Sequence, residues 1–165
     1  DFDSLGYKPE GDCVITHPVE KDDTDTLLAV KYAFEKGYKH FRIFGCIGGR
    51  LDHTFANIQT ASYIAENGGT AVFYGESENF TVIKNNHIRF EKNNSGNISV
   101  FALKDSKNVD IEGLFFEMKN GDLSPSFPLG VSNKFINTEA IISTKNGTLL
   151  IIWENKNKLT GEEHE

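Results

Sequence analysis

Apolar and polar residues follow two different patterns along the chain, and the change between them falls near residue 80. In the first half, strand-like apolar runs alternate with segments of helical period. Leu27, Val30 and Phe34 recur at helical spacing, and Gly37 then provides a helix stop. A first helix is therefore predicted to begin within residues 22–26 and to end at Gly37.

A second helix is predicted to follow the glycines at 48 and 49 and to end at the glycines at 68 and 69. Its expected apolar face consists of Leu51, Phe55, Ile58 and Ser62. The strand-like runs lie at residues 13–16, 40–46 and 70–74. Strands that alternate with helices of this length are typical of βαβ units. Residues 1–79 are therefore predicted to form an α/β domain with a largely parallel, Rossmann-like sheet.

Beyond residue 80 the helical period disappears and short β-rich runs take its place. These runs lie at residues 81–83, 98–103, 114–118, 136–143 and 148–153. Turns rich in Asn, Gly and Lys are expected between them, at residues 92–97, 119–122 and 145–147. Short strands separated by such turns are typical of small antiparallel folds. We therefore predict that residues 80–165 form an all-β sandwich domain.

Composition and charge narrow the classes of function. The chain has 165 residues, a hydrophobic content of 38% and a formal net charge of −7. An acidic chain lacks the basic footprint of nonspecific nucleic-acid binding, so no nucleic-acid partner is expected. No apolar run is long enough to span a membrane, and no signal peptide is visible, so a cytoplasmic location is expected. Four Asn-x-Ser/Thr sequences occur, including one at Asn79, and we interpret them as chance matches.

Three short acidic segments carry the candidate chemistry. They read DFDS at residues 1–4, KDDTD at residues 21–25 and GGRLDH at residues 48–53. Their candidate catalytic carboxylates are Asp1, Asp3, Asp22, Asp25 and Asp52. Clustered carboxylates repel one another unless a cation lies between them, and hard oxygen ligands suit Mg²⁺. For any one segment, a role as a helix cap is an equal alternative.

The second and third segments also suit phosphate. A helix start near Asp22 and Asp25 offers exposed backbone N–H groups that can receive phosphate. Gly48 and Gly49 allow the backbone to approach a ligand closely, and Arg50 offers a fork of donors. His53 follows Asp52, and a lone histidine in this position is more often a structural hydrogen bonder than a base.

The order and spacing of these segments resemble the thiamine pyrophosphokinase family, whose members carry (G)DFDS, KDxTD and GGRxDH in this order. Four later segments are also similar, namely SGNISVFAL, GLFFEM, GVSNKF and LLIIW. The resemblance implies transfer of a pyrophosphoryl group from ATP to the hydroxyethyl oxygen of thiamine, with release of AMP. It implies that Asp1, Asp3, Asp22 and Asp25 hold Mg²⁺ and the triphosphate. Lys21, Gly49 and Arg50 would contact phosphate, and Asp52 would lie near the metal or the attacking hydroxyl.

The resemblance also implies that the C-terminal domain lines the thiamine pocket and contributes to a homodimer. Ser132 and Asn133 would hydrogen-bond the aminopyrimidine, and Trp153 could stack on the flat cationic ligand. A plain β-turn at Ser132 and Asn133, and a core role for Trp153, are the structural alternatives. Family members have a further strand–helix region before DFDS, and we expect that region to be missing here.

Two other functions stay open at this point. One is a binding module that senses thiamine or its phosphate without turnover. The other is a haloacid-dehalogenase-type phosphatase, because DFDS is similar to that family's DxDxT loop. That second alternative leaves GGRLDH and the β-rich half of the chain without a role.

Overall fold

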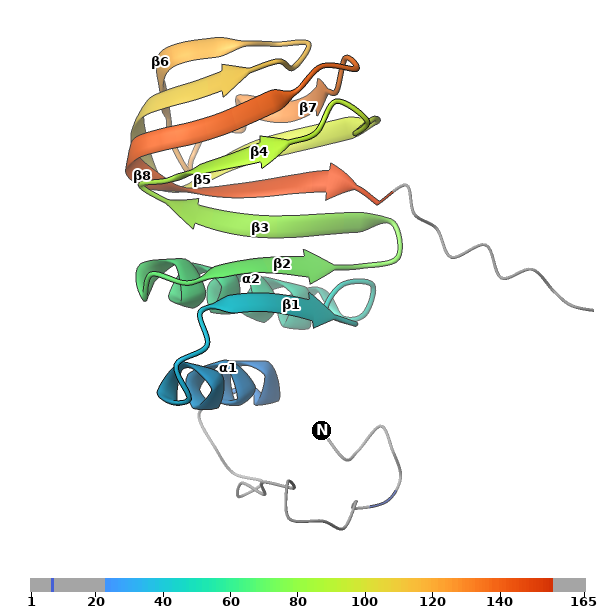
Figure 1. Ribbon diagram of the computed structural model, residues 1–165, viewed down its shortest axis with the longest axis vertical. Helices are drawn as coiled ribbons and strands as arrows, with labels where there is room; N and C mark the ends of the chain where they lie inside the picture. Colours follow the sequence, from blue (N-terminus) through green and yellow to red (C-terminus); the bar gives the residue numbers. More distant parts are fainter. Residues whose placement is uncertain (1–6, 8–22, 156–165) are drawn as a thin grey trace, which may run out of the picture.

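The computed structural model describes residue 7 and residues 23–155 of the chain. Within this part, two helices and eight strands follow one another (Figure 1). In chain order they are α1 (Asp25–Glu35), β1 (His40–Phe44), α2 (Leu51–Glu66), β2 (Thr70–Tyr74), β3 (Glu78–Lys84), β4 (His87–Phe90), β5 (Asn97–Glu112), β6 (Met118–Leu123), β7 (Gly130–Lys134) and β8 (Ala140–Glu154). Neither described helix is long and apolar enough to cross a membrane.

The predicted α/β domain with a largely parallel, Rossmann-like sheet is wrong. Within the described residues, β1 and β2 form a parallel pair, and the other named pairings are antiparallel. A parallel return needs a crossover of a dozen or more residues, whereas only residues 75–77 separate β2 from β3. The result is one mixed sheet of order β1-β2-β3-β8-β5-β6, with β4 on β8 and β7 on β5.

The sheet runs without a break across the predicted domain boundary, because that boundary falls inside β3 and Phe73 of β2 pairs with Phe80 of β3. The division of the chain into a domain of residues 1–79 and a domain of residues 80–165 stays a prediction. The strand predicted at residues 13–16 lies outside the described residues.

Both predicted helices are confirmed, but the apolar face of α2 is only partly the expected one, because Ile58 packs on the core whereas Leu51 and Phe55 do not. The Thr24 hydroxyl caps α1 by accepting a hydrogen bond from the Leu27 N–H at 3.3 Å. In α2, Leu51 is 83% exposed, whereas Ala61 and Ile64 are buried. The helix therefore packs against the sheet through its C-terminal half, and its first turn carries apolar side chains into solvent.

The long strands β5 and β8 replace several shorter predicted ones. The turn expected at residues 145–147 lies inside β8, and the turn expected at 119–122 lies inside β6. The β5–β8 register shifts between Ala102 and Lys107, where both strands bend (Figure 1). Gly147 is needed at this bend, because a Cβ there would lie 2.2 Å from the Ser106 hydroxyl oxygen.

Two apolar clusters lie on opposite faces of the sheet, and β3 takes part in both. Phe80 and Val82 belong to the cluster that α1 and α2 cover. Ile83 belongs to the cluster enclosed by the bent strands β5 and β8. Because β3 is buried on both faces, a polar side chain on this strand is withdrawn from water on either side.

Candidate active-site cleft

A cleft of about 1260 Å³ lies where the C-terminal ends of β1 and β2 meet the start of β3, the strand β4 and the end of β8. Its walls come from those two strand ends, the start of β3, the strand β4, residues 93–95 and the end of β8. Residues 45 and 47, which lead into the GGRLDH segment, line the cleft together with Tyr74. The cleft therefore joins a predicted phosphate-handling loop to the β-rich half of the molecule.

A row of paired residues crosses the sheet at this cleft. In spatial order it contains Phe44, Tyr74, Asn79, Trp153, Ile98 and Asn133, from strands β1, β2, β3, β8, β5 and β7. Directly paired residues on neighbouring strands present their side chains to the same face of a sheet. The predicted thiamine contacts Trp153 and Asn133 therefore share a face, separated by two strand spacings of about 4.8 Å each.

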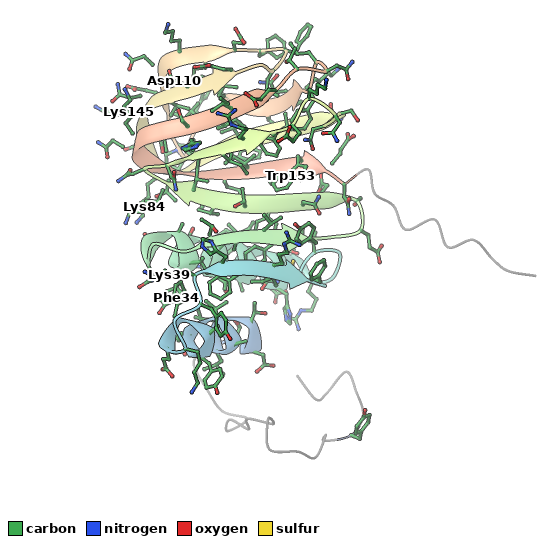
Figure 2. All side chains as sticks on the ribbon, in the orientation of Figure 1. Phe34, Lys39, Lys84, Asp110, Lys145 and Trp153 are labelled. Atoms are coloured by element: carbon green, nitrogen blue, oxygen red, sulfur yellow. The ribbon has the colours of Figure 1, made fainter. Side chains whose placement is uncertain are left out.

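Aromatic rings dominate the cleft end of this row. The rings of Phe44 and Tyr74 stack with centroids 4.7 Å apart. Trp153, which Figure 2 labels near the C-terminal end of β8, is half-buried and meets Phe90 edge to face at 5.2 Å. Phe44, Tyr74, Phe90 and Trp153 all line the cleft. These surfaces suit a flat ligand ring.

Asn79 lies between Tyr74 and Trp153 in the row, and it is the polar member nearest the cleft. Its side chain is only 6% exposed, and it lines the cleft. Within the described part of the chain, its carboxamide oxygen is the one buried side-chain N or O atom without a hydrogen-bond partner. Buried polar groups in folded proteins are rarely left in this state.

The loop of residues 45–50 carries the Gly-Gly-Arg segment from β1 into α2. Gly48 has a φ of +106°, a conformation that favours glycine. Asn57 of α2 donates from its amide nitrogen to the Cys46 carbonyl at 2.9 Å and so holds the loop against the helix. Cys46 is buried, and this burial raises the pKa of its thiol. Nothing lies within 4 Å of a Cβ placed at Gly49, so the backbone there is open to a ligand.

Arg50 and Asp52 are exposed, and they bind each other. The Arg50 Nε donates to Asp52 Oδ1 at 3.1 Å, and a second guanidinium nitrogen donates to the other carboxylate oxygen. The Arg50 hydrogen bonds hold the pKa of the Asp52 carboxyl below its usual range. Neither residue lines the cleft, although the loop just before them does. An Arg50 contact to phosphate would therefore share or replace its contact to Asp52.

Asp25 begins α1, where it occupies the first turn beside the capping residue Thr24. Its neighbour Asp23 accepts a hydrogen bond from the Lys31 ammonium at 2.6 Å. The other predicted phosphate and metal residues, Asp1, Asp3, Lys21 and Asp22, lie outside the described residues. Among residues 7 and 23–155, no group of three His, Cys, Asp or Glu side chains could hold a metal ion.

Asn133 and Ser132 lie in β7, where their contacts are structural. The Asn133 carboxamide accepts from the Phe116 N–H at 2.9 Å and donates to the Phe116 carbonyl at 2.7 Å. Asn133 is 5% exposed. Ser132 has a φ of +59°, and its N–H donates to the Ser99 hydroxyl at 3.1 Å. Neither residue lines the cleft, so the structure groups Trp153 with residues 45 and 47 but leaves Ser132 and Asn133 apart from them.

Sequence reasoning missed Phe44, Tyr74, Phe90 and Asn79 as cleft residues. The only available signal was a polar residue, Asn79, just before the apolar run of residues 80–83. That pattern identifies a polar residue next to a strand expected to be buried, but it does not indicate which cleft or cavity the residue lines.

Comparisons with known proteins agree with the motifs. The model for the thiamin pyrophosphokinase catalytic domain matches residues 1–73, and the model for the thiamin pyrophosphokinase vitamin B1 binding domain matches residues 85–149. A thiamine pyrophosphokinase of Bacillus subtilis is 29% identical over 149 residues, which make up 82% of this chain and 64% of that protein.

Solved structures have the same fold. The crystal structure of the Bacillus subtilis thiamine pyrophosphokinase matches with a TM-score of 0.75 and 26% identity, over 82% of this chain and 65% of that one. An Enterococcus faecalis thiamin pyrophosphokinase family protein matches with a TM-score of 0.73 and 25% identity, over 86% of this chain and 68% of that one. The chain thus spans about two thirds of the length of these relatives. The two domain models between them match most of the sequence, and the chain belongs to the thiamine pyrophosphokinase family.

Proposed function

We propose that this protein transfers a pyrophosphoryl group from ATP to the hydroxyethyl oxygen of thiamine, giving thiamine diphosphate and AMP. One observation carries the proposal: a single cleft joins the loop before GGRLDH to the aromatic wall that contains Trp153. Group transfer between two bound substrates requires that both be held next to each other. A cytoplasmic location is part of the same proposal.

In this proposal the two walls of the cleft have different tasks. Trp153 offers its ring to the cationic thiamine, an arrangement that a cation–π contact favours. On the other wall, Gly49 and Arg50 contact phosphate, together with Lys21. Asp52 restrains the Arg50 guanidinium and lies near the reacting hydroxyl. Ser132 and Asn133 are proposed thiamine contacts, although neither lines this cleft. They lie in β7, where Asn133 already holds the backbone of Phe116.

Mg²⁺ is the proposed cofactor, held by Asp1, Asp3, Asp22 and Asp25. Carboxylate oxygens are the donors that Mg²⁺ prefers, and the ion commonly binds substrate phosphates as well. When bound, it would neutralise charge on the triphosphate. Asp25 is the described member of this set, and it lies at the exposed start of α1.

A homodimer is the proposed assembly, and exposed apolar side chains around β7 support it. They are Phe115, Phe116, Phe127, Leu129, Val131 and Ile136, each at least 44% exposed. Exposed apolar groups that gather in one region commonly mark an interface. Sedimentation should detect a dimer of the unaltered chain and a monomer for Phe116→Glu. A monomeric unaltered chain would remove the dimer from the proposal.

The deciding experiment incubates the chain with ATP, Mg²⁺ and thiamine, then measures AMP and identifies thiamine diphosphate by mass. Equal amounts of the two products are expected. Thiamine binding without either product would favour the non-catalytic binding module instead. Omitting Mg²⁺ should abolish turnover, and restoring it should bring turnover back.

Asp25→Asn is expected to lower turnover by roughly a hundredfold or more, the usual effect of removing one preorganised electrostatic group. The substitution preserves shape at an exposed position, so the melting temperature should change little. The matched control is Asp23→Asn, which removes the neighbouring carboxylate that binds Lys31. Normal turnover by Asp25→Asn would exclude this residue from the mechanism.

A further inference from the structure

We propose that the carboxamide of Asn79 binds the amine-bearing edge of a nitrogen heteroaromatic ring in the cleft, accepting an N–H hydrogen bond through its oxygen. The proposal rests on the proposed function, because both substrates of that reaction carry such an edge. It assigns to Asn79 the role of a residue that determines specificity for the ring.

The first support is the state of the Asn79 side chain. It is 6% exposed, and no atom of the described residues forms a hydrogen bond with its carboxamide oxygen. Thr81 provides the contrast, because it is also buried, lies two residues further along β3 and faces the same side of the sheet. The Thr81 hydroxyl donates to the Ala71 carbonyl at 2.6 Å. The strand therefore satisfies one of these two polar groups internally and leaves the other, on a residue that lines the cleft, without a partner among the described residues.

The second support is the position of Asn79 between aromatic residues. Asn79 pairs with Tyr74 on one side and with Trp153 on the other, and all three line the cleft. The Tyr74 ring already stacks on Phe44, and the Trp153 ring packs against Phe90. A flat ring that enters this cleft can contact aromatic surface while its edge meets the carboxamide.

The third support is chemical complementarity. A carboxamide has a carbonyl acceptor next to an NH₂ donor. A ring with an amino group next to a ring nitrogen presents the matching donor and acceptor, and asparagine makes a comparable two-point contact to N6 and N7 of adenine in DNA. The 4-aminopyrimidine of thiamine and the adenine of ATP both have this arrangement. A carboxylate at this position would lack the donor, and an aliphatic side chain would lack both groups.

Calorimetric titrations of thiamine and of ATP, run separately, test the proposal on the full chain and on Asn79→Leu. The leucine has a similar size and removes both polar atoms. We expect one of the two affinities to fall by about tenfold, as for the loss of one hydrogen bond in a closed site. A fall for thiamine assigns the aminopyrimidine, and a fall for ATP assigns adenine. The proposal is overturned if neither affinity falls, or if the unaltered chain binds neither compound.

A ligand analogue that lacks the amino group removes the same hydrogen bond by changing the ligand and leaving the protein unaltered. A thiamine analogue with hydrogen in place of the 4-amino group, or a purine nucleoside triphosphate without the 6-amino group, should bind the unaltered chain about tenfold more weakly. For the ligand whose affinity depends on Asn79, Asn79→Leu should no longer show this tenfold difference between the amino compound and its deaminated analogue. Equal binding of both pairs by the unaltered chain would contradict the proposal even if Asn79→Leu failed to fold.

Stability separates a binding role from a structural one. Asn79→Leu replaces an unpaired buried carbonyl with an apolar group, so the melting temperature should stay the same or rise. Thr81→Val is the matched control, because it breaks an existing hydrogen bond and should lower the melting temperature while leaving both affinities unchanged. A lower melting temperature for Asn79→Leu with unchanged affinities would make Asn79 structural.

The turnover assay is read independently of these results. If the unaltered chain binds thiamine or ATP in an Asn79-dependent way but forms no thiamine diphosphate, the proposed reaction fails and the assignment of Asn79 stands. If thiamine diphosphate forms and no affinity depends on Asn79, the reaction stands and the assignment fails.

Discussion

Two places in this sheet where polar side chains are buried treat them differently. At the bend of β5 and β8, the Ser106 hydroxyl donates to the Lys104 carbonyl at 2.8 Å and accepts from the Thr148 N–H at 3.2 Å. The Thr144 hydroxyl donates to the Lys107 carbonyl at 3.2 Å. At the cleft, the carboxamide oxygen of Asn79 has no partner among the described residues.

This difference separates groups that hold the fold together from a group that the fold leaves without a partner. The bend needs its hydroxyls because register shifts interrupt the regular ladder there, and backbone groups must find other partners. The ladder around Asn79 is regular, since β3 pairs with β8 at every position from Glu78 to Lys84. Its side chain is therefore not required by the backbone.

The largest expected effect on stability is at the bend. Gly147→Ala should lower the free energy of unfolding by about 3 kcal/mol, near the upper end for overpacking a closed site. The added Cβ would lie 2.6 Å from the Ser106 Cα, so backbone has to move. Urea unfolding measures the change. Gly49→Ala is the control, because a Cβ there meets nothing within 4 Å, and an equal loss in that variant would refute the steric argument.

Ser106→Ala should cost about 2 kcal/mol, because it leaves the buried Thr148 N–H without its acceptor. The free energy of unfolding of this variant can be compared directly with that of Asn79→Leu, which is expected to show no loss of stability. Both variants can be measured in the same urea series. Equal losses at the two positions would mean that the bend and the cleft do not differ in the way proposed here.

The smallest effect concerns the exposed ion pair beside the cleft. Because hydrogen bonds from Arg50 lower the pKa of the Asp52 carboxyl, the pair adds stability above the usual aspartate pKa. That contribution disappears as the pH falls through the lowered pKa of folded Asp52. It should be small, because the two side chains are 74% and 59% exposed.

Carboxyl NMR titration of the unaltered chain and of Arg50→Gln measures this shift, and the variant should return the pKa of Asp52 toward its usual value. Glu66, at the other end of α2, provides the control. Its pKa is lowered by Lys104, so the substitution of Arg50 should not affect it. The titration of Glu66 should be the same in both proteins. An unchanged pKa of Asp52 in Arg50→Gln would assign the shift to the neighbouring backbone N–H of His53.

Much of the local structure could be predicted from the sequence. Helical spacing and terminal glycines predict α1 and α2, and the run at residues 70–74 is β2. Local patterns report the period of an element well, because that period follows from backbone geometry alone. They report its partners poorly. The predicted face of α2 was wrong at Leu51 and Phe55, which have the right spacing but lie beyond the part of the helix that packs on the sheet.

The sequence by itself determined the family, through the order and spacing of DFDS, KDDTD and GGRLDH, because these segments are read without knowing where they lie in space. The tertiary structure alone decided that β3 returns antiparallel to β2, and that Phe44, Tyr74, Asn79 and Trp153 share one face of the sheet. Residues 44 and 153 are far apart in the chain, and strand pairing depends on contacts between distant segments, which no local pattern encodes. Those pairings put a buried carboxamide between aromatic residues, and its oxygen has no hydrogen-bond partner in the described part of the chain.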